Sequence, residues 1–447
     1  MSSALSSKKE LRFNALHDLV RSGGTKSEAW RREQLQRIGN ILEEYENEIL
    51  KALKADLGKP ENEAIIEIIA LKQELTLATK KLREWIKPKR IDVPIALQPG
   101  QAQIQLEPLG CVLIIGPWNY PFSLTIQPLI SALAAGNTAV LKPSEHSHYT
   151  SELIEKIFTE KFPKEIVQVC QGSGDVASEL IHHSFDHIFF TGGSAIGQKV
   201  LEGAAKKLIP VTLELGGKSP ALILEGADLD VTARRILWGK SLNAGQTCLA
   251  PNHLIIHEKV KDLFLKKLRK ELFNFYGQNP LNSPDLAQII NKNHFSRLIK
   301  LIEQARNNKQ ILFGGDVNAE SNLITPTICN VSSEDDPLLA EELFGPVLPI
   351  LTFSSFPEII NQIQEDPSPL AIYMFGGTSE EKELLIRKTR SGGICFNDVI
   401  MQAGIPNMPF GGVGLSGMGR YHGFSGFETF SNKRAILQRP FFLDFKL

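Results

Sequence analysis

Cysteine is scarce in this sequence and long apolar runs are absent. Both features restrict the classes of protein to which the chain can belong. Only five cysteines occur among 447 residues, and no CxxC pair is present. An odd cysteine count without such pairs argues against a disulfide framework and against a thiolate metal site, so we expect a reducing compartment and no metal. No stretch approaches the ~18 consecutive apolar residues of a membrane-spanning helix, and the first residues lack the apolar core of a signal peptide. These features predict a cytoplasmic protein without a transmembrane segment.

An excess of charge is also absent. The 49 basic and 50 acidic side chains leave a formal net charge of -1 at pH 7, and no basic run exceeds the short cluster Lys87-Pro-Lys-Arg90. Proteins that bind nucleic acid through its phosphates need a basic patch, so we do not expect nucleic acid as a partner. A chain of 447 residues, 42% of them hydrophobic, has enough apolar material for two or three units with large cores.

The order of apolar and polar residues predicts helices first and a mixed α/β region afterwards. Apolar residues recur at intervals of three and four between about residues 8 and 85, which is typical of helices. Residues 91–107 turn to alternation between prolines, which favours an exposed ribbon and a candidate oligomerisation arm. From residue 109 short apolar strands alternate with helices, and a second such region runs from about 219 to 423. This pattern indicates parallel sheets covered on both faces.

One cysteine differs from the others in its neighbours. Four lie in short apolar segments, where a thiol is usually buried: Cys111, Cys170, Cys329 and Cys395. Cys248 instead follows Gln246 and Thr247 in a polar stretch directly after the predicted helix 229–242, so we expect its thiol to be reachable. Glu214 ends an apolar strand and precedes two glycines. A thiol and a carboxylate on separate segments form the nucleophile and base that covalent catalysis with a later water attack requires.

Polar residues follow the predicted strands of the first α/β region. Ligands of parallel sheets bind beyond the carboxyl ends of the strands. Lys142 and Glu145 suit ribose hydroxyls there, with a solvated ion pair as the alternative reading. Gly192 and Gly193 let the backbone approach a ligand, and we expect Ser194 to cap free N–H groups of the next helix. Because this segment does not match GxGxxG, it fits a plain tight turn equally well.

Seven short motifs, taken together, resemble those of the aldehyde dehydrogenase superfamily over almost the whole chain. They are Pro117-Trp-Asn119-Tyr-Pro, Lys142-Pro-Ser-Glu145, Phe190-Thr-Gly192, Leu213-Glu-Leu-Gly-Gly-Lys-Ser-Pro220, Gly245-Gln-Thr-Cys248, Glu342-Leu-Phe-Gly-Pro346 and Pro409-Phe-Gly-Gly412. The ending Gly417-Met-Gly-Arg-Tyr-His-Gly423 and the Asn397-Asp398-Val segment are most similar to the class 3, fatty-aldehyde branch. The chain departs from the family pattern at Gly193, where many relatives carry a polar or small side chain, and shows no hydrophobic anchor after Arg439.

The resemblance implies a fold and a division into domains. The fold is an α/β, aldehyde dehydrogenase-like one, with a Rossmann-type cofactor domain, an α/β catalytic domain and a small β oligomerisation arm. The cofactor domain would take residues 1–85 and 109–213, the catalytic domain residues 214–423, and the arm and bridging segments residues 86–108 and 424–447. The branch it resembles is generally dimeric, so a homodimer is expected.

The resemblance also implies roles for named residues. Cys248 would attack the aldehyde, Asn119 and the Cys248 N–H would hold the oxyanion, and Glu214 would activate water against the thioester. NAD would accept the hydride, with NADP as the second option because a carboxylate at Glu145 repels a 2′-phosphate. The residues implied for the cofactor are Trp118, Lys142, Ser144, Glu145, Gly192, Gly193, Ser194, Gly197, Glu342 and Phe344. Those expected along an apolar tunnel for medium or long aliphatic and aromatic aldehydes are Tyr120, Phe122, Trp238, Leu242, Ile400 and Met401.

Other functions fit parts of the pattern. An acylating semialdehyde dehydrogenase would pass the thioester to coenzyme A or phosphate, but it needs no base for water, so Glu214 favours hydrolysis. A thiol esterase would leave the nucleotide-like crevice unexplained. A binding protein on the same fold would not need Cys248, Glu214 and Asn119 together.

Overall fold

A six-stranded sheet forms the centre of the first of two lobes. The computed structural model describes residues 13–365 and 368–441, so residues 1–12 and 442–447 of the expected terminal segments lie outside it. The order of the sheet is β17-β7-β6-β3-β4-β5. Five of its strands are parallel, as the sequence predicts: β3 (Cys111–Ile115), β4 (Thr138–Lys142), β5 (Val167–Val169), β6 (His187–Thr191) and β7 (Val211–Glu214).

Helices cover both faces of this sheet. Successive side chains of a strand point to opposite faces, so Val112 and Ile114 of β3 belong to one core and Leu113 to another. The first core contains α2 (Glu28–Glu44), α3 (Glu46–Leu57), α4 (Glu61–Trp85), α5 (Ser123–Ala135) and α6 (His148–Lys161). The second contains α1 (Phe13–Arg21), α7 (Gly174–Ile181) and α8 (Ser194–Ala205). The predicted helical leader is thus α1 to α4: α1 packs on β3 and β4, and α2 to α4 pack on α5 and α6.

The second lobe repeats this layered plan on a seven-stranded sheet. Its order is β10-β13-β14-β9-β8-β15-β16, and β10 (Ile311–Phe313) is its antiparallel edge. The other strands are β8 (Pro220–Ile223), β9 (His253–His257), β13 (Thr327–Asn330), β14 (Val347–Phe353), β15 (Ala371–Phe375) and β16 (Gly393–Phe396). One face packs on α9 (Leu229–Ser241) and α10 (Glu258–Tyr276), the other on α13 (Phe356–Glu365) and α14 (Ser379–Lys388). A third apolar cluster joins α11 (Lys292–Asn307) and α12 (Pro337–Ala340) to β13 and β14.

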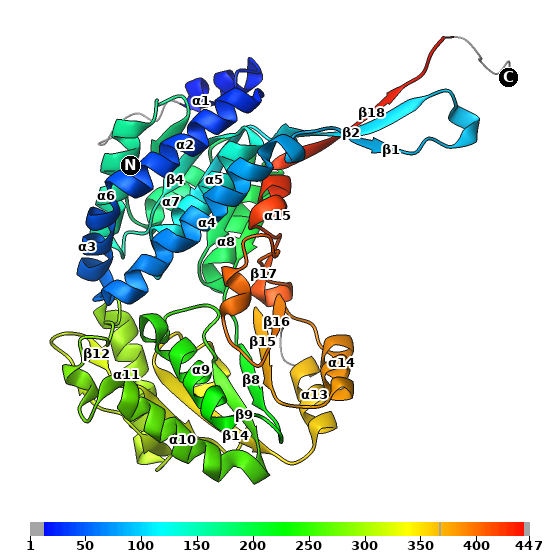
Figure 1. The fold of residues 1–447 in the computed structure, drawn as a ribbon. Coiled ribbons are helices and arrows are strands. Elements are labelled where there is room, and N and C mark those ends of the chain that lie inside the picture. Colours follow the sequence, from blue (N-terminus) through cyan, green and yellow to red (C-terminus); the bar gives the residue numbers. More distant parts are fainter. Residues whose placement is uncertain (1–12, 366–367, 442–447) are drawn as a thin grey trace.

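The ribbon expected at residues 91–107 is part of an arm that extends away from both lobes (Figure 1). Its antiparallel strands are β1 (Lys89–Ile91), β2 (Gln101–Pro108) and β18 (Ser431–Gln438), with β2 in the middle rather than at an edge. Alternation arises here because the apolar residues of β2 share one face, where Leu106 packs against the core of the first lobe. Ile95 and Leu437 of the arm are 91% and 54% exposed, respectively.

The boundary near residue 423 differs from the expected one. Residues 417–418 form β17, which pairs with β7 and so completes the first sheet, although they were assigned to the catalytic domain. Helix α15 (Gly423–Thr429) packs on α4 and α5 rather than on the arm. The chain therefore returns to the first lobe before it enters the arm. Within the described residues, no helix has the length and apolar character needed to cross a membrane.

Candidate active site

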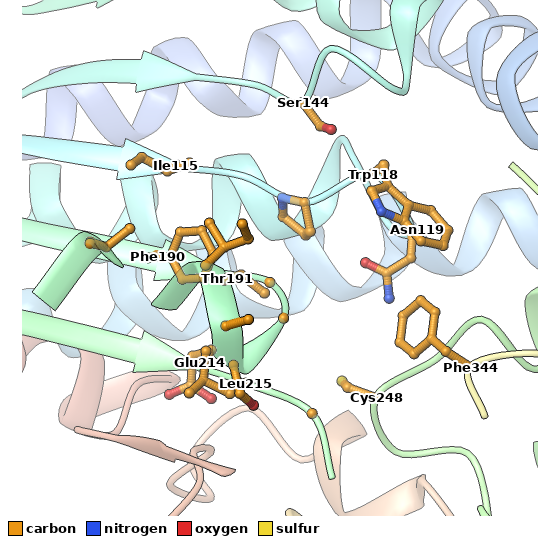
Figure 2. Close-up of a pocket in the computed structure, with 18 of the residues that line it drawn as sticks. Ile115, Trp118, Asn119, Ser144, Phe190, Thr191, Glu214, Leu215, Cys248 and Phe344 are labelled. Atoms are coloured by element: carbon orange, nitrogen blue, oxygen red, sulfur yellow. The ribbon is translucent and has the colours of Figure 1, made fainter. Parts of the chain in front are cut away.

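A cavity of about 1160 Å³ lies where the first sheet faces the second lobe. The strand register places Ile115 of β3 beside Lys142 of β4, and Thr191 of β6 beside Glu214 of β7. The carboxyl ends of these strands therefore meet at one edge, where a parallel sheet binds ligands. Cys248 reaches the same cavity from the second lobe (Figure 2). The polar residues singled out at the strand ends are thus gathered around the thiol.

A tight backbone turn brings Cys248 to the cavity. Directly after α9, three residues in succession adopt positive φ: Asn243 at 53°, Ala244 at 52° and Gly245 at 75°. Side chains with a Cβ are strained in this region, and such strain clusters at functional sites. Gly245 is required here because an added Cβ would lie 2.3 Å from the carbonyl oxygen of Gly345. The turn reverses the chain, so that Cys248 faces the first lobe instead of continuing along the helix.

Hydrogen bonds across the lobes hold this turn. The Asn243 side-chain amide donates to the carbonyl of Asn119 at 2.9 Å, and the Asn119 amide donates to the carbonyl of Gln246 at 3.1 Å. Within the second lobe, Ile290 N donates to the side-chain oxygen of Gln246 at 3.0 Å. Figure 2 shows the Asn119 amide on the side of the cavity that holds Cys248. The two segments expected to act together are therefore directly bonded.

The thiol of Cys248 is only partly accessible and strongly protonated. Removal from water raises its pKa to about 12, and the carboxylates of Glu342 and Glu214 act in the same direction. Backbone N–H groups of Cys248 and Leu249 oppose this shift. Cys395 is also half-buried but does not line the cavity, whereas Cys111, Cys170 and Cys329 are buried. The expectation that Cys395 is buried like the other three is thus wrong, and accessibility alone does not single out Cys248.

Glu214 is a buried acid without a partner. It is 3% exposed, and neither carboxyl oxygen has a hydrogen-bond partner among the described residues. Burial raises the pKa of Glu214 well above its usual value, although Arg420 acts in the opposite direction. Gly411 lies so close that an added Cβ would be 2.8 Å from Glu214 Oε1. A carboxyl group with a raised pKa at the edge of a cavity is typical of a general base.

The glycine pair after Glu214 makes room for a second acid. An added Cβ on Gly216 would lie 2.1 Å from Glu342 Oε2, and the backbone of Gly217 bonds the Glu342 carboxylate. Burial raises the pKa of Glu342 to about 7, while Gly217, Lys240 and Arg297 lower it. A Cβ on Gly217 would instead meet Leu370 N at 3.3 Å, so Gly216 is the glycine that this close approach to Glu342 requires.

Nine of the ten residues expected to bind a cofactor line the cavity. They are Trp118, Lys142, Ser144, Glu145, Gly192, Gly193, Ser194, Glu342 and Phe344. Gly197 does not line it: an added Cβ would lie 2.8 Å from Leu215 Cδ2, so this glycine allows α8 to pack closely on the sheet. Ser194 does not cap α8, whose N-cap is Gly193; its hydroxyl donates to the carbonyl of Leu415 at 3.3 Å.

The cavity has groups that suit a dinucleotide. Lys142 is buried and donates to the exposed carboxylate of Glu145 at 2.7 Å, so the ion pair considered as an alternative is present, with only its acidic partner open to solvent. An added Cβ on Gly193 would meet nothing within 4 Å, which leaves the start of α8 open to a phosphate. Trp118 and Phe344 meet edge to face across the lobes, with ring centroids 5.2 Å apart. The cavity therefore offers polar side chains for a ribose, a helix N-terminus for a phosphate and aromatic rings for a flat ring.

Thr191, His294 and Arg297 are among the residues of the cavity wall that sequence reasoning missed. Thr191 ends β6, and its buried hydroxyl has no hydrogen-bond partner among the described residues. His294 and Arg297 lie on α11, and His294 packs against Trp118 with ring centroids 5.1 Å apart. Thr191 could have been found because it ends a predicted strand beside Gly192. No local signal marks the other two, because α11 reaches the cavity only through the packing of the lobes.

The residues expected along a substrate tunnel do not line this cavity. Trp238 and Ile400 pack half-buried against the same apolar cluster as Cys248, and Tyr120 is bonded to Thr247 at 2.7 Å. Leu242 is buried at the end of α9, while Met401 is 52% exposed. The expectation that Phe122 lines the tunnel is wrong. This residue is fully buried in the core of the first lobe with α5, so it has no surface for a ligand.

Known proteins resemble this chain over nearly its whole length. A model of the Aldehyde dehydrogenase family matches residues 24–436. The Pongo abelii protein named Aldehyde dehydrogenase family 3 member A2 is 41% identical over 96% of this chain and 88% of its own. The Mus musculus protein named Aldehyde dehydrogenase, dimeric NADP-preferring, is 42% identical over 95% of this chain and 93% of its own. A solved structure, the substrate-bound state of Staphylococcus aureus AldH, superposes with a TM-score of 0.94 at 40% identity over 97% of this chain and 94% of that one.

The raised thiol pKa predicts how the free protein reacts with iodoacetamide. Because only the thiolate reacts, alkylation of Cys248 is expected to be slow at pH 7 and to rise about tenfold per pH unit towards pH 9. Peptide mass spectrometry on the folded protein measures this, with buried Cys111 and Cys329 as unmodified controls. A rate at Cys248 that does not change with pH would mean that the thiolate already exists in the free protein.

Proposed function

The chain belongs to the aldehyde dehydrogenase family, and we propose that it oxidises medium- or long-chain aliphatic or aromatic aldehydes to carboxylic acids through a thioester on Cys248. It is an NAD(P)-dependent aldehyde dehydrogenase, and its relatives include the family 3 proteins that the sequence motifs indicated. The observation that supports the proposed roles most directly is one cavity lined by the Cys248 thiol and the unpaired Glu214 carboxyl.

We assign the steps to this chain's residues as follows. The Cys248 thiolate attacks the carbonyl carbon, and the Asn119 amide and the Cys248 N–H hold the oxyanion that forms. NAD(P)⁺, when bound, supplies the hydride acceptor. Glu214 then takes a proton from water, and the resulting hydroxide cleaves the thioester to the acid and frees the thiol. A raised pKa suits Glu214 for this, and its activity as a base is lost as the pH falls through that pKa.

An acylating reaction is the enzymatic alternative. It would pass the acyl group to coenzyme A or phosphate, neither of which needs a base to activate water. The partner-free carboxyl of Glu214 inside the cavity favours hydrolysis.

Glu214→Gln separates the two halves of the reaction. If Glu214 serves hydrolysis, the variant forms about one reduced cofactor per site in a rapid burst and then stalls as an acyl-enzyme. Stopped-flow absorbance gives the burst, and intact mass gives an adduct of acyl size on Cys248. A variant that shows neither burst nor adduct would give Glu214 an earlier role, such as activating the thiol.

For the cofactor we propose a preference for NAD. The Glu145 carboxylate lies at the cavity wall, bonded to Lys142, where it can accept from a ribose 2′-hydroxyl and repel a 2′-phosphate. The mouse relative's name describes that protein as NADP-preferring, so membership of the family does not by itself fix the preference.

Glu145→Gln is expected to raise kcat/KM for NADP relative to NAD on the order of tenfold, equivalent to about 1.4 kcal/mol. Initial rates with each cofactor measure the ratio. Glu152→Gln, on the outside of α6, is the control for loss of a nearby carboxylate. Equal ratios in wild type and Glu145→Gln would remove Glu145 from the specificity.

For the substrate we propose an apolar entrance beside Cys248. Trp238 and Ile400 pack against the same cluster as the thiol, and the Gly239 position brings α9 against Val399 and Ile400. Met401 offers exposed apolar surface next to them. A long hydrocarbon chain would bury its methylenes there.

Chain length should therefore raise kcat/KM. Each buried methylene contributes ~0.8 kcal/mol, so roughly a three- to fourfold rise per carbon is expected until the entrance is filled. The measurement is a series from acetaldehyde to dodecanal with saturating NAD. Trp238→Ala should flatten the series while leaving acetaldehyde turnover within about twofold. A flat series in the wild type would refute the long-chain assignment and leave the general reaction intact.

We also propose a cytoplasmic homodimer assembled through the arm. The five cysteines are free, as in a reducing compartment, and the arm presents unpaired strand edges with exposed Leu437. The mouse relative is named dimeric.

Light scattering at micromolar concentration is expected to give twice the mass of one chain. Leu437→Glu places a charge on the arm and should shift the mass towards the monomer. Leu208→Glu is the matched control, because Leu208 is 89% exposed in the turn after α8 and lies outside the arm. A monomeric wild type would reject the proposal.

A further inference from the structure

A buried ion pair lies behind the site, where the mechanism uses no charge. Lys59 precedes α4 and Glu67 lies on it, and both side chains have 0% exposed surface. Lys59 Nζ and Glu67 Oε1 are 2.6 Å apart. A buried ion pair contributes little net stability, because the loss of hydration offsets most of the attraction. The role of the pair is therefore to be sought in the other contacts that Lys59 and Glu67 make.

These contacts fix both ends of the segment that carries Asn119. Lys59 Nζ donates to the carbonyl oxygen of Asn119 at 2.8 Å, and Glu67 Oε2 accepts from the backbone N–H of Ser123 at 2.9 Å. The Lys59 ammonium also lies 4.0 Å from the centroid of the Tyr120 ring. The Lys59–Glu67 ion pair thus holds segment 119–123 at both of its ends.

The carbonyl of Asn119 is bonded twice. It accepts from Lys59 and, at 2.9 Å, from the Asn243 side chain of the cysteine turn. A carbonyl oxygen has two lone pairs, so these donors use its full capacity and fix the plane of the peptide. The fixed peptide places the Cα of Asn119, and the side-chain amide is then oriented by its own bond to Gln246 O, two residues before Cys248.

We propose that Lys59 is a positioning residue for the oxyanion-binding amide of Asn119, an inference that rests on the proposed aldehyde oxidation. During turnover the Asn119 amide must meet an oxyanion at the carbon bonded to Cys248. With Lys59 removed, the 119–120 peptide loses one of its two fixed contacts, and the amide spends less time in the reactive orientation. Misplacement of this kind is expected to slow the acylation half of the reaction on the order of tenfold.

The variant must remove the contact without leaving a buried charge. Lys59→Met/Glu67→Gln neutralises the pair and keeps an acceptor for Ser123 N–H. Glu67→Gln alone keeps the Lys59 contact to Asn119 and measures the separate effect of leaving the Lys59 charge without its partner. Lys59→Met/Glu67→Leu is a second, apolar replacement should the first fold poorly. Arg31→Met is the control for losing another buried cation of this lobe, which donates to the carbonyl of Ala134 rather than to Asn119.

The readout is the rate constant of cofactor reduction in a single turnover with saturating NAD and octanal. It is measured for each variant with Asn119 present and in the Asn119→Ala background, alongside the melting temperature and the Kd for NAD. When Asn119 is present, we expect Lys59→Met/Glu67→Gln to slow cofactor reduction about tenfold. In the Asn119→Ala background the same double substitution should slow it less than about twofold, and the Kd for NAD should not change in either background. Arg31→Met should lower the melting temperature and leave the rate within about twofold.

An equal slowing in both backgrounds would overturn the role of Lys59, because its effect would then not pass through Asn119. Failure of the proposed function looks different: the wild type would reduce no cofactor with an aldehyde. An Asn119→Ala variant that reduces cofactor at the wild-type rate would remove the oxyanion role of Asn119, and that of Lys59 with it.

Discussion

The site depends on hydrogen bonds between two backbone segments from different lobes. Asn119 follows β3 of the first sheet, and Asn243 and Gln246 belong to the turn that follows α9 of the second lobe. These contacts are buried, where an unmade hydrogen bond costs more than in water. They hold the strained turn in place, and this turn positions Cys248 at the cavity. Each lobe alone would present half of the site.

Burial also sets the electrostatics of this junction. Cys248, Glu214 and Glu342 all have raised pKa values because the cavity removes them from water, and the two acids raise the pKa of the thiol further. The free protein therefore keeps its nucleophile as a thiol, which protects it from oxidation and alkylation. A bound positive charge in the cavity would lower the thiol pKa and raise the reactivity. The same burial makes the Glu214 carboxylate a stronger base for the hydrolytic half of the reaction.

Local patterns predicted the parts of this arrangement that depend on short segments. Apolar runs such as Cys111–Ile115 became parallel strands, and the polar residues after them meet at one edge because parallel strands end together. Residues whose position depends on packing between elements escaped prediction. Phe122 neighbours Asn119 and Tyr120 in the sequence, yet it turns into the core because α5 begins there. Lys59 lies in the short loop before α4 and His294 on α11, in stretches with no distinctive local pattern, and only the packing of these elements brings the two residues to the site. The end of the second lobe was misplaced for a similar reason, since a two-residue strand carries too little pattern to reveal its pairing with β7.

The central claim is that the single thiol of Cys248 performs the chemistry, and replacing it tests that claim most directly. Cys395 is the matched comparison, because it is the other half-buried cysteine of the described chain and lies outside the cavity. NAD-dependent oxidation of octanal is measured for Cys248→Ala and Cys395→Ala, with circular dichroism to confirm folding. The account predicts a loss of at least about 10³-fold for Cys248→Ala and a change within about twofold for Cys395→Ala. Turnover of folded Cys248→Ala above trace levels would contradict it.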